Sequence, residues 1–102
     1  MKDKYNNEIK LYKYNTFLKK LKGFMFKKNI EFAIYFPNVN SIHTFFMRQP
    51  IDVIMTDKNF NILYVFKAVK PNKIILPKKN VYYTFELPIN KLNFDINEKI
   101  VI

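Results

Sequence analysis

The residue types best suited to chemistry in this chain lie between Ile42 and Asp57. This run holds the only histidine, His43, and the only arginine, Arg48, among several aromatic residues. A carboxylate, Asp52, follows within an apolar stretch. Because polar groups cost free energy when they are buried, such a cluster needs bonding partners or a function. The spacing therefore predicts a site in this part of the chain.

Two segments on either side of Arg48, Ile42–Met47 and Ile51–Thr56, are expected to pair as a hairpin. In that register His43 and Asp52 are diagonal neighbours on one face, within reach of each other's side chains. A slip of one residue would move His43 to the opposite face. In the expected register, Arg48 would hold an anionic group, Asp52 would orient a basic residue, and His43 would bind a ligand or transfer protons. The expected ligand-binding residues are His43, Phe46, Met47, Arg48 and Asp52.

Competing explanations of the cluster stay open. The structural one ranks first: an Arg48–Asp52 pair would fix the hairpin, and a backbone carbonyl would satisfy His43. The leading function is a domain that binds a ligand or partner through this pocket. The first alternative is an enzyme that acts on a small anionic substrate with His43, the one catalytic candidate, as acid or base. A triad with Ser41 is not favoured, because the chain has no Gly-x-Ser-x-Gly element.

Composition excludes several kinds of site. The chain has no cysteine, so disulfides, thiolate metal ligands and cysteine nucleophiles are ruled out. A zinc site would need carboxylates beside a single histidine, which is unusual, and neither a metal nor another cofactor is expected. One glycine cannot form a glycine-rich phosphate loop.

The net charge of +10 on 102 residues could attract phosphates or anionic lipid. Nearly all of it is lysine, in a chain rich in Asn, Ile, Phe and Tyr, as adenine- and thymine-rich coding sequences produce. This compositional explanation of the charge ranks above non-specific nucleic-acid binding, which is the second alternative function.

The expected partner is a small anionic ligand or a protein, and the expected state is a monomer or weak dimer. Residues 1–13 contain no signal or membrane-spanning segment, so a cytoplasmic protein without membrane insertion is expected.

Helical signals are confined to one short segment that would position part of such a site. Thr16 stands where an N-cap is expected. Phe17, Leu18 and Leu21 then recur at helical spacing. Gly23, the only glycine, suits the left-handed residue that ends a helix. We expect a helix of about two turns, with its lysines in solvent and its apolar stripe against a sheet.

The rest of the chain is typical of short strands divided by turns that contain Pro and Asn. The expected strands are Ile9–Lys13, Phe32–Phe36, Ile42–Met47, Ile51–Thr56, Asn61–Lys67, Ile74–Leu76 and Val81–Leu87, with Ile100–Ile102 closing the sheet. Residues 1–102 are expected to form one domain with a flexible lead over residues 1–8. The fold class is mainly β: a small β-sandwich or barrel of jelly-roll type with one short N-terminal helix.

Three parts of the chain resemble the family known as domain of unknown function 192. Gly23–Lys27 (Gly-Phe-Met-Phe-Lys) resembles its Gly-Leu-Met-Phe-Arg element, and Glu86–Pro88 resembles its Leu-Glu-Leu-Pro element. His43–Arg48 and then Pro50–Ile54 resemble its central signature in close detail. The resemblance covers about Lys10–Ile102 and implies a small, mostly β domain with one short helix. It informs the fold more than the function, since the family has no established activity.

This chain lacks glycines that the family usually shows at three turns. Phe60 or Asn61 stands at the first turn and Asn97 at the second. At the third, Pro88 is followed by Ile and Asn90, where the family has Pro-Ala-Gly. Asparagine tolerates positive φ better than most residues, so the turns are expected to survive. If the third glycine lets a ligand approach the backbone, that site is weakened here.

Overall fold

The structure is a computed structural model that describes all 102 residues except the side chain of Phe17. It contains one short helix, α1 (Phe17–Lys22), and otherwise strands and loops. The strands are β1 (Leu11–Lys13), β2 (Ala33–Pro37), β3 (Ile42–His43), β4 (Ile51–Thr56), β5 (Ile62–Val69), β6 (Ile74–Ile75) and β7 (Tyr83–Pro88). The expected mainly β fold with one early helix is confirmed.

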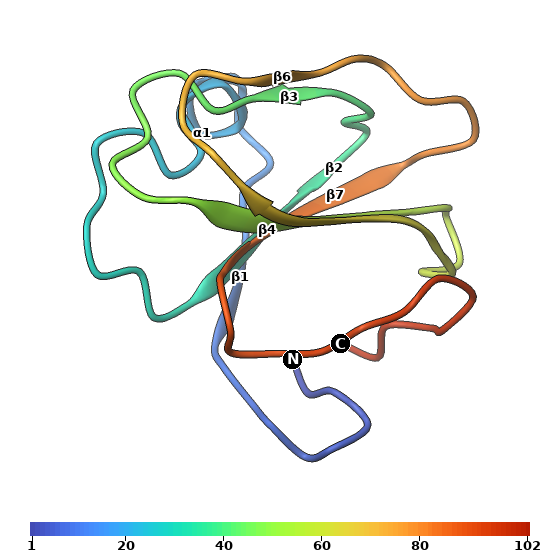
Figure 1. Cartoon of the computed structure of the whole chain (residues 1–102). Helices are drawn as coiled ribbons and strands as arrows, with labels where there is room; N and C mark the ends of the chain where they lie inside the picture. The colour runs from blue at the N-terminus through green and yellow to red at the C-terminus, as the bar shows by residue number, and fades with distance from the viewer.

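Two sheets form the molecule, and they do not close into a barrel. Five strands pair in the order β1-β2-β7-β4-β5, with β1 and β2 parallel and the other neighbours antiparallel. The second sheet consists of β3 and β6 alone. Figure 1 shows β3, β6 and α1 on one side of the large sheet, and both chain termini on the other. The architecture is therefore layered and sandwich-like.

The expected hairpin between Ile42–Met47 and Ile51–Thr56 is wrong. His43 in β3 is paired with Ile74 of β6, while β4 lies between β5 and β7. Every residue of β4 is buried, and this strand lies inside the large sheet, where it has two long partners, β5 and β7. Beyond β3, Thr44 turns the chain by donating its hydroxyl to the Lys70 carbonyl at 2.7 Å.

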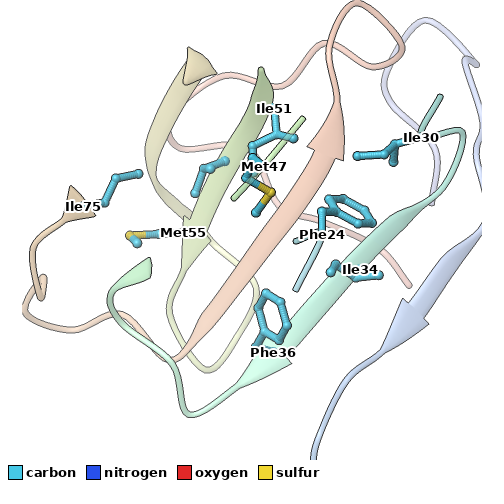
Figure 2. Packing of buried hydrophobic residues seen from close by; sticks show 9 residues of the cluster. Phe24, Ile30, Ile34, Phe36, Met47, Ile51, Met55 and Ile75 are labelled. Carbon is cyan, nitrogen blue, oxygen red and sulfur yellow. The ribbon is translucent and has the colours of Figure 1, made fainter. Parts of the chain in front are cut away.

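Alternation along the central strands produces a core on each face of the large sheet. The helix-side core consists of Phe24, Ile30, Ile34, Phe36, Met47, Ile51, Val53, Met55 and Ile75 (Figure 2). The terminal-side core consists of Ala33, Ile54, Ile62, Phe85, Leu87, Leu92, Phe94 and Ile100. Because both faces are covered, β4 is apolar on its two sides, apart from Asp52 and Thr56.

The caps of α1 follow the sequence expectation. Thr16 has extended backbone geometry, and its hydroxyl oxygen accepts a hydrogen bond from the Lys19 N–H at 3.3 Å. Gly23 follows the last turn with φ of 49°, and its N–H donates to the Lys19 carbonyl. A threonine start and a glycine end therefore confine the helix to six residues.

The expected orientation of the helix's apolar stripe is wrong. Leu18 and Leu21 are 74% and 55% exposed, and the side chain of Phe17 lies outside the described part of the structure. The anchor to the sheet is Phe24, which comes after the helix and is fully buried in the helix-side core. With that residue filling the space against the sheet, the two leucines of α1 are left in solvent.

The termini together cover the second face of the sheet. Ile100 is buried there, but the expected strand Ile100–Ile102 is wrong, since only the preceding Lys99 forms an isolated bridge. Asp3 is also buried and accepts a hydrogen bond from the Asn93 N–H at 2.8 Å. No helix among the described residues is long and apolar enough to span a membrane.

Candidate functional site

The three polar residues of the expected site lie in different places. His43 is half-buried at the end of β3, on the helix side of the large sheet. Asp52 is buried in β4, where alternation with Val53 directs it to the terminal side. Arg48 is exposed in the loop between them. The structure therefore does not bring these three groups together on one face.

Asp52 holds an irregularity in β5. Its Oδ1 accepts a hydrogen bond from the Ala68 N–H at 2.8 Å, and its Oδ2 lies 3.5 Å from Lys67 Nζ. Ala68 has φ of 49° at a register shift between β4 and β5. The expected pairing of Asp52 with Arg48 is wrong, because the cation beside this carboxylate is Lys67. Its contacts make Asp52 a structural residue of a β-bulge.

The two apolar residues of the expected site are also separated. Met47 is buried in the helix-side core, as Figure 2 shows. Phe46 is 62% exposed, has φ of 62°, and stacks on Phe26 with 5.6 Å between ring centroids. Met47 therefore fills the core, whereas Phe46 belongs to the surface around α1.

His43 has a ring nitrogen, Nε2, that can donate a hydrogen bond to a ligand. Its Nδ1 accepts a hydrogen bond from the Phe45 N–H at 3.2 Å, and the two rings stack at 5.2 Å. The expected bond from His43 to a backbone carbonyl is therefore wrong for this nitrogen, which accepts and does not donate. A neutral imidazole that accepts at Nδ1 carries its proton on Nε2, so a hydrogen-bond donor is available there.

His43 lines a pocket that lies between α1, β3 and β6. The pocket has a volume of about 600 Å³ and is lined mostly by apolar side chains. Its polar lining residues are Lys20, Lys22, Ser41, His43 and Glu86. We call this cavity the Glu86 pocket. It combines an apolar interior with a few polar groups, as small-molecule sites do.

Glu86 is the functional candidate that sequence reasoning missed. It comes from β7, and its residue is only 3% exposed. Its Oε1 accepts one hydrogen bond, from the Phe24 N–H at 3.3 Å. Burial raises the pKa of the Glu86 carboxyl to about 8, and the bond from Phe24 only partly offsets this effect. At neutral pH the carboxyl therefore holds a proton and can donate a hydrogen bond.

Gly23 makes room for this carboxyl. A Cβ at position 23 would lie 2.8 Å from Glu86 Oε1, closer than real Cβ contacts allow. The sequence contains two separate signals, an acidic residue within the strand Val81–Leu87 and a single glycine at the end of the helix. Both were recognised as local pattern, but their proximity depends on long-range packing.

Comparison with known proteins gives a family match over nearly the whole chain. Residues 1–99 match the family model DUF192, described as "Uncharacterized ACR, COG1430". A UPF0127 protein from Thermococcus sibiricus is 35% identical over 95 residues, which are 84% of this chain and 61% of that protein. Another from Pyrococcus horikoshii is 40% identical over 80 residues, or 72% of this chain and 68% of that protein. The chain thus spans about two thirds or less of these relatives.

A solved structure shares the fold. A crystal structure of a protein of unknown function from Novosphingobium aromaticivorans matches with a TM-score of 0.67 and 15% sequence identity. The match covers 76% of this chain and 61% of that one. At this identity the likeness supports the fold alone.

Proposed function

Since this chain belongs to the DUF192 family, which is described only as uncharacterised, we propose a function from the geometry of its own site. The proposed function is to bind a small anionic ligand with an apolar body in the Glu86 pocket. The observation that carries the proposal is a cavity of about 600 Å³ with a buried, protonated carboxyl among apolar walls. A volume of this size suits a small organic molecule.

The walls favour an apolar ligand body. Leu21 from α1, Ile42 from β3 and Ile74 from β6 line the pocket, and the ring of Phe45 extends the apolar lining. Burying apolar ligand surface against such side chains is favourable by roughly 25 cal/mol per Å² removed from water. Affinity for the body of the ligand would therefore come from this lining.

The polar groups favour an anionic head. Lys20 and Lys22 are cations, His43 offers Nε2–H, and the protonated Glu86 offers a hydroxyl. All four groups can donate hydrogen bonds to a carboxylate or a similar anion. His43 thus keeps the binding role expected from the sequence, while Lys20 and Lys22 take the part expected of Arg48.

The test is a calorimetric titration with a panel of aliphatic and aromatic carboxylates. We expect binding near neutral pH, weakened roughly tenfold by His43→Leu, which has no side-chain donor in place of Nε2–H. Arg48→Gln is the matched control, since Arg48 is exposed outside the pocket, and it should leave the affinity unchanged. Absence of binding across the panel, or equal losses in both variants, would contradict the proposal.

The pH dependence gives a second, independent test. Above about pH 8 Glu86 loses its proton, and its charge then repels an anionic ligand. Binding should weaken through that range in the unmodified protein but not in Glu86→Gln, which stays neutral. If a bound ligand were also converted, and conversion were lost in His43→Gln, the alternative function as an enzyme would apply.

A further inference from the structure

Four large apolar side chains lie in solvent around α1. Leu18, Leu21, Phe26 and Phe46 are all more than half exposed. Leu18, Leu21 and Phe26 line one shallow groove of about 470 Å³, and the ring of Phe46 stacks on Phe26. We call these four residues the α1 face. Contiguous apolar groups of this kind mark interaction surfaces in soluble proteins.

Backbone geometry indicates that the two phenylalanines are not there for stability. Phe26 has φ of 65° and Phe46 has φ of 62°, in the left-handed region that bulky residues rarely adopt. Their strain costs free energy, and the exposed rings recover little of it by burial. The Phe26 N–H donates to the Phe46 carbonyl at 3.0 Å, so the two strained turns support each other. Backbone strain that burial of the side chain does not offset is typical of functional surfaces.

The surroundings of the α1 face are positively charged. The lysines between residues 16 and 28 are Lys19, Lys20, Lys22, Lys27 and Lys28, and this segment contains no acidic residue. Several carboxylates lie on the terminal side of the sheet, where Asp95 and Glu98 contact Lys4. An excess of cations therefore lies in the segment that carries most of the exposed apolar groups.

We propose that the α1 face docks on the surface of an anionic lipid bilayer. Leucine and phenylalanine side chains would enter the boundary between headgroups and acyl chains, while the lysines would contact lipid phosphates. Lysine suits this role because its long stem lies along apolar surface and its ammonium group reaches the headgroups. Charge complementarity selects this partner, since a strongly anionic and partly apolar surface matches both properties of the face. Figure 1 shows α1 far from both termini, so docking leaves them clear of the membrane.

Vesicle flotation tests the proposal with the full chain. The probes are phosphatidylcholine vesicles with and without phosphatidylglycerol, at low and high salt. We expect binding only to the anionic vesicles and a loss of binding as salt increases. A Leu18→Gln/Phe26→Asn/Phe46→Asn variant should bind about tenfold more weakly, because binding scales with buried apolar area. Asparagine tolerates the positive φ at both phenylalanine positions, so this variant should fold.

Matched controls separate docking from simple attraction of a basic protein. Ile96→Gln and Val101→Gln remove exposed apolar side chains far from α1 in the sequence and should bind as the unmodified protein does. The Lys27→Gln/Lys28→Gln variant should also bind the anionic vesicles more weakly than the unmodified protein, as the apolar variant does. Normal binding by the apolar variant, or binding lost only with the lysines, would overturn the proposal. Binding to duplex DNA that the apolar variant also retains would identify a nucleic acid as the partner instead.

Discussion

Glu86 couples folding to pH because the fold removes its carboxyl from water. Its pKa rises from an ordinary value of 4.5 to about 8 on burial. Between these two values the folded protein holds a proton that the unfolded chain has released. The free energy of unfolding should therefore fall as pH rises from about 4.5 to 8, with a slope approaching about 1.4 kcal/mol per pH unit for this group. Urea denaturation at a series of pH values measures this slope.

The Glu86→Gln variant isolates that effect. Glutamine has nearly the same shape and does not ionise, so the difference in stability between the two proteins should grow in favour of the variant towards pH 8. Below pH 4.5 the difference should be constant, because both states of the unmodified protein are protonated there. Parallel stability curves across the whole range would show that Glu86 is charged in the folded protein.

Gly23→Ala should destabilise the protein by ~1–3 kcal/mol. The new Cβ would meet Glu86 Oε1 at 2.8 Å, and φ of 49° is unfavourable for alanine. Chemical denaturation of the single variants and the Gly23→Ala/Glu86→Ala double variant separates these two causes. The steric part should disappear in the double variant, giving a coupling of roughly 0.5–3 kcal/mol. Strictly additive losses would mean that only backbone strain matters.

The bulge between β4 and β5 depends on a side chain in the neighbouring strand. Asp52 satisfies the Ala68 amide at 2.8 Å, and this bond should be worth more than the contact with Lys67, whose side chain is half exposed. We expect Asp52→Ala to lower the free energy of unfolding by ~1–3 kcal/mol, because the partly buried hydrogen bond between the Asp52 carboxylate and the Ala68 amide is lost. Lys67→Gln should cost less than ~1 kcal/mol, as for other exposed ion pairs. Equal losses in thermal or urea unfolding would assign the stability to the ion pair.

Individual elements follow closely from local sequence. The cap pair Thr16 and Gly23 predicted the bounds of α1, and the apolar run of β4 was predicted as Ile51–Thr56. The turns that lack the family's glycines also behave as expected for positive φ: Asn97 has φ of 75°. Phe60, at 65°, is held by a stack on the Tyr83 ring with 4.3 Å between centroids. Local propensity and turn chemistry are sufficient for α1, β4 and the turn at Asn97, whereas the turn at Phe60 also uses a tertiary contact.

Pairing and the site depend on information that local patterns do not contain. Nothing in the spacing of Ile42–Met47 distinguishes a hairpin with β4 from the observed pairing of β3 with β6. That choice decides which face His43 occupies, so one wrong pairing led to a wrong cluster. The Glu86 pocket joins residues 23, 43 and 86, which only the tertiary fold brings together. His43 was found because a sole histidine is conspicuous in any sequence.

The layers of the whole molecule differ in how firmly they are held. In the large sheet β4 is paired with β7 over six residues, whereas β3 and β6 share two residue pairs. We call the sheet of β3 and β6, which lines the Glu86 pocket, the pocket layer. A short two-stranded ladder is only marginally stable by itself, so this layer depends on Ile75 in the helix-side core and on the hydrogen bonds of Thr44. A layer of this kind can open while the five-stranded sheet stays folded.

Amide hydrogen exchange should therefore be faster in the pocket layer than in the large sheet. The Thr44 N–H, which donates to the Lys73 carbonyl at 2.8 Å, is a suitable probe, and we expect its opening free energy to be at least ~2 kcal/mol below that of β4 and β7 amides. A carboxylate that binds the Glu86 pocket at 100 times its Kd should raise the Thr44 value by up to about 2.7 kcal/mol, since opening this layer destroys the site. Equal protection of Thr44 and β4 without ligand would mean that both sheets unfold as one unit. In that case ligand entry would need a preformed opening rather than movement of β3 and β6.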